Sequence, residues 1–81
     1  MVVTVLLFAH LAETSGAERL SIDLPAGSTV ADALDRLAGT HPSIAAIRPI
    51  LAVAVNERYA ATDQILCDGD TLALIPPVSG G

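Results

Sequence analysis

Apolar residues follow two different periods along the chain, and these periods predict its secondary structure. Residues 2–8 (VVTVLLF) are β-branched or apolar on both faces, which is typical of a central strand. Residues 19–24 alternate between polar and apolar side chains and predict a half-buried strand. We expect a short helix at residues 9–15, closed by Gly16, between these two strands. The turn at Pro25-Ala26-Gly27 then ends an antiparallel hairpin that has a long connection.

One amphipathic helix is predicted after this turn. Thr29 offers a hydroxyl N-cap, and Asp32 places a carboxylate in the first turn, which is close to a capping box. The apolar stripe at helical spacing comprises Val30, Ala33, Leu34, Leu37 and Ala38. Gly39 is the predicted C-cap, and Pro42 is read as the stop. Residues 43–49 are expected to form a loop or a short helical turn.

The second half of the chain adds further strands. Residues 50–56 and 71–75 are apolar and predict strands, and residues 57–60 predict a short strand or an extension of a turn. Asp68-Gly69-Asp70 predicts a tight turn in which the glycine takes a positive φ. The first and last strands are apolar on both faces, so we expect them to be central neighbours.

This order of elements predicts an α+β domain. We expect a β-grasp fold, in which a mixed four- to five-stranded sheet packs on one main helix. The domain is predicted to cover residues 1–77, and residues 78–81 are expected to form a flexible C-terminal tail.

Composition and charge narrow the classes of function. The formal net charge of −5 disfavours binding to nucleic acid or to an anionic membrane and favours a basic protein surface as partner. No apolar run approaches the roughly 18 residues needed to span a bilayer. A single cysteine cannot form an internal disulfide, which fits a cytoplasmic location. The chain has no lysine, so none of its side chains can form a Schiff base or an isopeptide bond.

The sequence offers only weak evidence for catalytic residues in the body of the domain. Cys67 lies beside Asp68, and carboxylates do not activate a thiol, so we interpret the cysteine as structural or incidental. His10 and His41 lack the spacing of metal ligands, and the turn at residues 68–70 lacks the oxygen ligands of a calcium loop. We therefore predict no metal site, no bound cofactor and no enzymatic turnover by the chain itself.

The last seven residues, IPPVSGG, carry the most specific chemistry. Pro76 and Pro77 end the last strand and form a stiff exit, because neither has an N–H to donate. Gly80 has no side chain and can enter a narrow channel. The carboxylate of Gly81 is unhindered, so it can attack the α-phosphate of ATP and, as an acyl-adenylate, accept sulfur. A frayed end of no function is the alternative.

Strand alternation also predicts a docking surface. If Val3, Val5 and Leu7 face the helix, Phe8 faces outward. Ile75 faces outward on the last strand for the same reason. An apolar patch that contains both side chains would suit a protein interface. The alternative is that loops partly cover the two residues.

Four segments resemble the small, sulfur-carrying subunits of molybdopterin synthase. They are VLLFAHLAE (residues 5–13), LPAGSTVADALDRLA (24–38), VAVNERY (53–59) and LCDGDTLALIPPVSGG (66–81), and together they span most of the chain. This family has a ubiquitin-like β-grasp fold. One departure is FAHLAE, where many members have a pattern like FARLRE, so a salt bridge from that helix is in doubt.

The resemblance implies a carrier role. An activating enzyme would adenylate Gly81 with ATP, and a sulfur donor would convert it to a thiocarboxylate. The tail, from Pro76 and Pro77 through Val78 and Ser79 to Gly80, would insert into the synthase large subunit. There the sulfur would pass to cyclic pyranopterin monophosphate and form molybdopterin. The large subunit would supply the catalytic lysine, and two carriers would flank a dimer of large subunits.

Three alternatives remain at this point. The first is a sulfur carrier for another pathway, such as thiazole or cysteine synthesis, which shares the fold and the diglycine. The second is a ubiquitin-like modifier that is joined to lysines of other proteins through Gly81. The third is a structural β-grasp module, whose function would survive deletion of that glycine.

Overall fold

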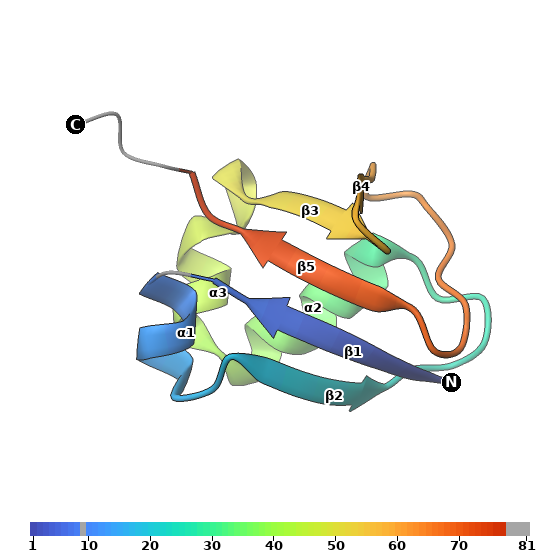
Figure 1. Cartoon of the computed structure of the whole chain (residues 1–81), viewed down its shortest axis with the longest axis horizontal. Coiled ribbons are helices and arrows are strands. Elements are labelled where there is room, and N and C mark those ends of the chain that lie inside the picture. Colours follow the sequence, from blue (N-terminus) through green and yellow to red (C-terminus); the bar gives the residue numbers. More distant parts are fainter. Residues whose placement is uncertain (9, 78–81) are drawn as a thin grey trace.

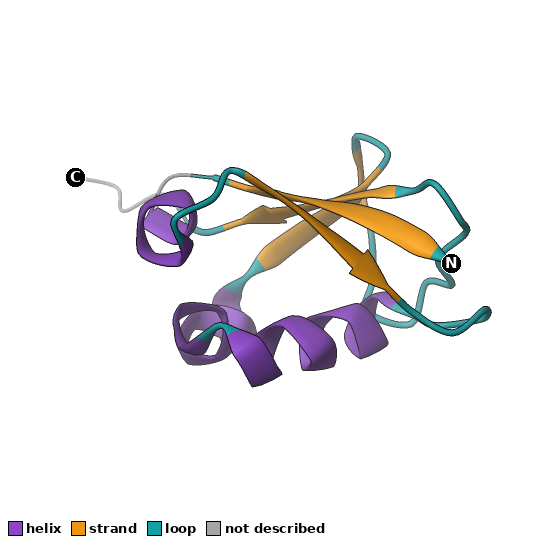
Figure 2. Ribbon diagram, turned by 90° about the horizontal axis from the view of Figure 1, so that it is seen from below, coloured by secondary structure: helices purple, strands orange, loops and turns teal. Residues whose placement is uncertain are grey.

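A five-stranded mixed sheet forms one layer of the protein, and the main helix packs across one of its faces (Figures 1 and 2). The computed structural model describes residues 1–8 and 10–77. The strands are β1 (Val2–Leu7), β2 (Arg19–Asp23), β3 (Ala52–Val55), β4 (Arg58–Tyr59) and β5 (Thr71–Ile75). Their order in the sheet is β2-β1-β5-β3-β4. The α+β class and the five-stranded mixed sheet are confirmed.

The two central strands are β1 and β5, which run parallel to each other. Val5 lies opposite Leu72 and Leu7 lies opposite Leu74. Strand β2 pairs antiparallel with β1, and β3 pairs antiparallel with β5 (Figure 1). The predicted hairpin and the predicted adjacency of the first and last strands are both confirmed.

The main helix, α2 (Val30–Thr40), begins with a complete capping box. The Asp32 N–H donates to the Thr29 hydroxyl at 3.3 Å, and the Thr29 N–H donates to the Asp32 carboxylate at 2.9 Å. These two bonds satisfy donors that a helix N-terminus otherwise leaves free. The Val30 and Ala31 N–H groups donate to the carbonyls of Gln64 and Thr62, so the local capping box and the loop at residues 62–64 together fix the helix start.

The predicted end of this helix is wrong. Helix α2 continues through Gly39, and its C-cap is His41, whose N–H donates to the Leu37 carbonyl at 2.8 Å. Pro42 stands in the first turn of the next helix, α3 (Pro42–Ile47), where a proline lacks only an N–H that would have no helical partner. A 3₁₀ turn (Arg48–Ile50) follows, so the predicted strand at residues 50–56 shortens to Ala52–Val55.

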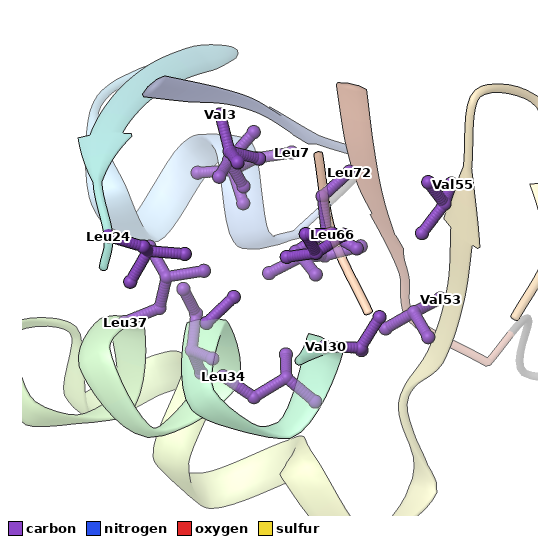
Figure 3. Packing of buried hydrophobic residues seen from close by; sticks show 14 of the residues in the cluster. Val3, Leu7, Leu24, Val30, Leu34, Leu37, Val53, Val55, Leu66 and Leu72 are labelled. Atoms are coloured by element: carbon purple, nitrogen blue, oxygen red, sulfur yellow. The ribbon is translucent and has the colours of Figure 1, made fainter. Parts of the chain in front are cut away.

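The core is aliphatic and lies between the sheet and α2 (Figure 3). Val3, Val5 and Leu7 point from β1 toward the helix, as the alternation predicted. The other main contributors are Leu72 and Leu74 of β5 and Val30, Leu34 and Leu37 of α2. Leu11 of the short helix α1 (His10–Ser15) and Ile44 of α3 are fully buried and extend this core. The opposite face of the sheet is left for other contacts.

Candidate functional site

A groove of about 590 Å³ lies on the face of the sheet that α2 does not cover. We call it the outer groove. Its apolar lining consists of Leu6 and Phe8 from β1 and the residue after it, Ala73 and Ile75 from β5, and Ala54 and Tyr59 from β3 and β4. These residues alternate with the core residues of the same strands, so the groove and the core occupy opposite faces.

The strand register explains why this face is hollow. Ala73 of β5 lies opposite both Leu6 of β1 and Ala54 of β3, and Ala54 in turn lies opposite Tyr59 of β4. Two small alanines therefore form the floor, while larger side chains stand at either side. A leucine or phenylalanine at position 54 or 73 would fill the space.

The outer groove gathers both aromatic residues of the chain. Phe8 is 46% exposed and Tyr59 is 81% exposed. Large exposed aromatic side chains that share one concave surface are typical of protein interfaces, because they add apolar contact area with little loss of side-chain entropy. The face is therefore suited to a protein partner.

The structure brings together Phe8 and Ile75, the two residues predicted from alternation, since both line the groove. Ile75 is half-buried. Their role in binding stays a prediction. Sequence reasoning missed Tyr59, because its place beside the groove depends on how β4 pairs with β3. The signal that the sequence offered was an aromatic residue directly after the polar residues 56–58.

The chain leaves the sheet next to this groove. Strand β5 ends at Ile75, which lies opposite Ala52 of β3. Pro76 is half-buried and Pro77 is exposed, so the backbone emerges from the sheet at these two residues. The remaining predicted site residues, Val78, Ser79, Gly80 and Gly81, lie outside the described residues, and their roles remain predictions.

A hydrogen-bonded turn fixes the start of β5. The Asp70 carboxylate accepts from the Asn56 side-chain amide at 2.9 Å and from the Cys67 N–H at 2.7 Å. The Asn56 side-chain carbonyl accepts from the Thr71 N–H at 3.0 Å. Gly69 takes a φ of +86°, as the tight turn requires. These contacts tie the β3–β4 hairpin, which forms one side of the groove, to the strand that leads into the tail.

The other candidate residues have no shared site. Cys67 is exposed and does not form a disulfide. His10 lies 3.8 Å from Glu13, whereas His41 contacts the Thr40 hydroxyl at 2.8 Å. Within residues 1–8 and 10–77, no cluster of three or more histidine, cysteine or acidic side chains could hold a metal ion. No helix in this same part of the chain is long and apolar enough to cross a membrane.

The sheet order, the single long helix across one face and the exit of the chain from a central strand define a ubiquitin-like β-grasp domain. The chain belongs to the ThiS family, whose model matches residues 5–81. The match includes the diglycine at residues 80–81.

Two curated relatives show the range of this family. A molybdopterin synthase sulfur carrier subunit of Arabidopsis thaliana is 40% identical over 79 residues, which cover 98% of this chain and 82% of that protein. Small archaeal modifier protein 1 of Haloferax volcanii is also 40% identical, over 83 residues that cover 93% of this chain and 95% of that protein.

Solved structures agree with the sequence relatives. The crystal structure of the Haloferax volcanii modifier protein has a TM-score of 0.86 at 36% identity and covers both chains completely. A putative molybdopterin converting factor, subunit 1, from Pyrococcus furiosus has a TM-score of 0.86 at 29% identity, with 96% of this chain and 99% of that chain covered. The predicted β-grasp fold and the predicted family are confirmed.

Proposed function

We propose that the protein is the sulfur carrier of molybdopterin synthesis. The observation that carries the proposal is the match to molybdopterin synthase sulfur carrier subunits over 98% and 100% of this chain, together with the family model, which matches through Gly81. The structure is consistent with it, because the central strand β5 leads directly to Pro76 and Pro77 beside an apolar groove. A carrier needs both features, because its partners must bind a surface of the domain and also reach the C-terminal tail.

The chemistry would take place at Gly81. Its carboxylate attacks the α-phosphate of ATP, pyrophosphate leaves, and an acyl-adenylate forms in the activating enzyme. A sulfur donor then displaces AMP and leaves a thiocarboxylate. In the synthase, this sulfur passes to cyclic pyranopterin monophosphate. The chain itself would be a substrate and a subunit rather than an enzyme, and the ATP would be bound by its partner.

The synthase large subunit would dock in the outer groove. Phe8 and Ile75 would be covered in the complex, while Pro76, Pro77, Val78, Ser79 and Gly80 would lead the tail into the active site. This chain has no lysine, so a catalytic lysine would have to come from the partner. Two carriers would bind a dimer of large subunits, and the complex would be cytoplasmic.

Intact-mass analysis tests the carrier role. The protein is incubated with ATP, its activating enzyme and sulfide, and its mass should rise by the difference between one sulfur and one oxygen atom. The variant that lacks Gly81 should show no such gain. A mass that stays constant while ATP is consumed and AMP appears would contradict the transfer of sulfur to this chain.

A second candidate function is protein modification. It is favoured by the equal identity to small archaeal modifier protein 1. In the same experiment, a modifier would appear as adducts on lysines of other proteins when a cell extract is added. A sulfur carrier would instead convert cyclic pyranopterin monophosphate to molybdopterin when the large subunit is added.

The docking surface is tested with Ile75→Asp. The substitution places a charge in the groove at a half-buried position, so binding to the large subunit should weaken strongly. Circular dichroism checks that the domain remains folded. An unchanged dissociation constant in a calorimetric titration would show that the large subunit binds elsewhere.

A further inference from the structure

Two consecutive residues with positive φ form the tip of the β3–β4 hairpin. Asn56 has a φ of 50° and Glu57 a φ of 71°, and these are the non-glycine residues with positive φ in the described part of the chain. Val55 pairs with Arg58, so the loop between the strands has two residues. Such a loop with two positive φ values is a type I′ turn, in which the second position favours glycine.

Asn56 is accounted for by the fold. Its side chain accepts from the Thr71 N–H and donates to the Asp70 carboxylate, and asparagine tolerates the left-handed conformation better than most residues. The residue therefore gains two hydrogen bonds in return for its backbone geometry.

Glu57 has no such compensation. Its side chain is exposed, and within residues 1–8 and 10–77 its carboxylate makes neither a hydrogen bond nor an ion pair. A left-handed conformation is unfavourable for a residue with a Cβ atom, and strain of this kind concentrates at functional positions. Glu57 is one of the residues that line the outer groove, which points to a role in binding rather than in folding.

The electrostatics of the groove define what Glu57 can bind. Among the described residues that line the groove, Glu57 is the only charged one, and Arg19 lies on the same face beyond Leu6, with which it pairs, at the far side from the hairpin tip. Arg58, the next residue, pairs with the core residue Val55 and so lies on the opposite face of the sheet from Tyr59. A partner that places an apolar side chain in the groove would therefore find a negative charge at its rim.

We propose that Glu57 is a specificity-determining residue of the outer groove. Its carboxylate pairs with an arginine or lysine that the synthase large subunit presents beside its apolar contact. The inference rests on the proposed docking of the large subunit in this groove. Beyond that docking, the inference states that the partner's contact residue is positively charged and that Glu57 is the residue that recognises it.

Two substitutions separate the strain of Glu57 from its charge. Glu57→Gly relieves the backbone, so the Tm should rise by about 4 °C, because the relief exceeds the entropy that glycine adds to the unfolded chain. Glu57→Gln keeps the shape and should leave the Tm unchanged. Both should raise the Kd for the large subunit about fivefold at low salt and make it less dependent on salt, because one ion pair is lost.

Asp63→Asn is the matched control. Asp63 is exposed and lies outside the groove lining, so this variant removes the same charge without touching the rim. Its Kd should stay close to that of the unchanged protein. A loss equal to that of Glu57→Gln would mean that net charge, and not this position, governs binding, and would overturn the inference.

Two groove variants keep the inference separate from the proposed function. If Ile75→Asp and Tyr59→Ala weaken binding while both Glu57 variants bind normally at every salt concentration, the large subunit docks in the groove and the role of Glu57 is wrong. If all four variants bind normally, the docking proposal itself fails. A Tm that falls in Glu57→Gly would refute the argument from backbone strain.

Discussion

Replacing Asp70 with alanine tests how the carrier fixes the strand that precedes its tail. The carboxylate accepts two hydrogen bonds, from the Asn56 amide at 2.9 Å and from the Cys67 N–H at 2.7 Å. Bonds to a charged acceptor are worth more than neutral ones, but both are exposed and water replaces part of each, so the loss is about 1 kcal/mol per bond and about 2 kcal/mol in total. For a domain of this size the Tm should fall by about 8–16 °C.

Urea unfolding followed by circular dichroism measures this change. Asp70→Asn should lose about half as much, because its amide keeps one acceptor oxygen but turns a donor toward a second donor. Asp63→Ala serves as the control, since that carboxylate is exposed and makes no hydrogen bond to any described residue. A free energy of unfolding for Asp70→Ala that equals that of the control would refute the view that this turn holds the hairpin to β5.

Three further substitutions have separable effects. Thr29→Ala removes the hydroxyl that caps α2, so urea unfolding should show a loss of about 1 kcal/mol. No loss would mean that the other hydrogen bonds at the helix start, such as that from the Ala31 N–H to the Thr62 carbonyl, are sufficient. The added methyl group in Gly69→Ala meets no neighbouring atom within 4 Å, so any loss of stability comes from the positive φ alone. The free energy of unfolding should fall by about 1 kcal/mol, and an unchanged Tm in calorimetry would contradict this cause. Tyr59→Ala should leave the Tm within about 2 °C, because the side chain is 81% exposed, yet raise the Kd for the large subunit about tenfold; normal binding would exclude this residue from the interface.

Much of the fold could be predicted because strong local signals agree with the tertiary structure. Strand β1 alternates so that Val3 and Val5 enter the core, and the capping box at Thr29 fixes the start of α2. The central, adjacent positions of β1 and β5 could be predicted from their apolar character on both faces, whereas their parallel direction is known only from the structure. In each case the local pattern and the buried surface require the same arrangement.

The end of α2 could not be predicted because its signals have two meanings. Gly39 is exposed in the helix, and apart from the backbone of the helix itself no described part of the fold lies within 4 Å of the position that a Cβ would occupy. Gly39 therefore resembles a C-cap in the sequence, but inside the helix its only cost is the lower helix propensity of glycine. Pro42 can end one helix or begin the next, and only the packing of Ile44 in the core decides between them.

The candidate site was partly predictable. Alternation placed Phe8 and Ile75 on the outer face, but the groove also needs Tyr59, which reaches it through the pairing of β4 with β3. Glutamate at the second position is contrary to the ordinary preferences of a type I′ turn, so residues 56–57 could not be predicted to form one. The conflict between glutamate and a positive φ is seen only when the backbone conformation is known.

The central place of β5 also has a mechanical consequence. The strand is bonded along its length to β1 on one side and to β3 on the other. A pull on Pro76 acts along the strand axis, perpendicular to the hydrogen bonds on the antiparallel side and oblique to the slanted bonds on the parallel side. It therefore loads both ladders mainly in shear, and their bonds must yield together rather than one by one. The domain should therefore resist unfolding when a partner protein pulls on the tail that follows β5.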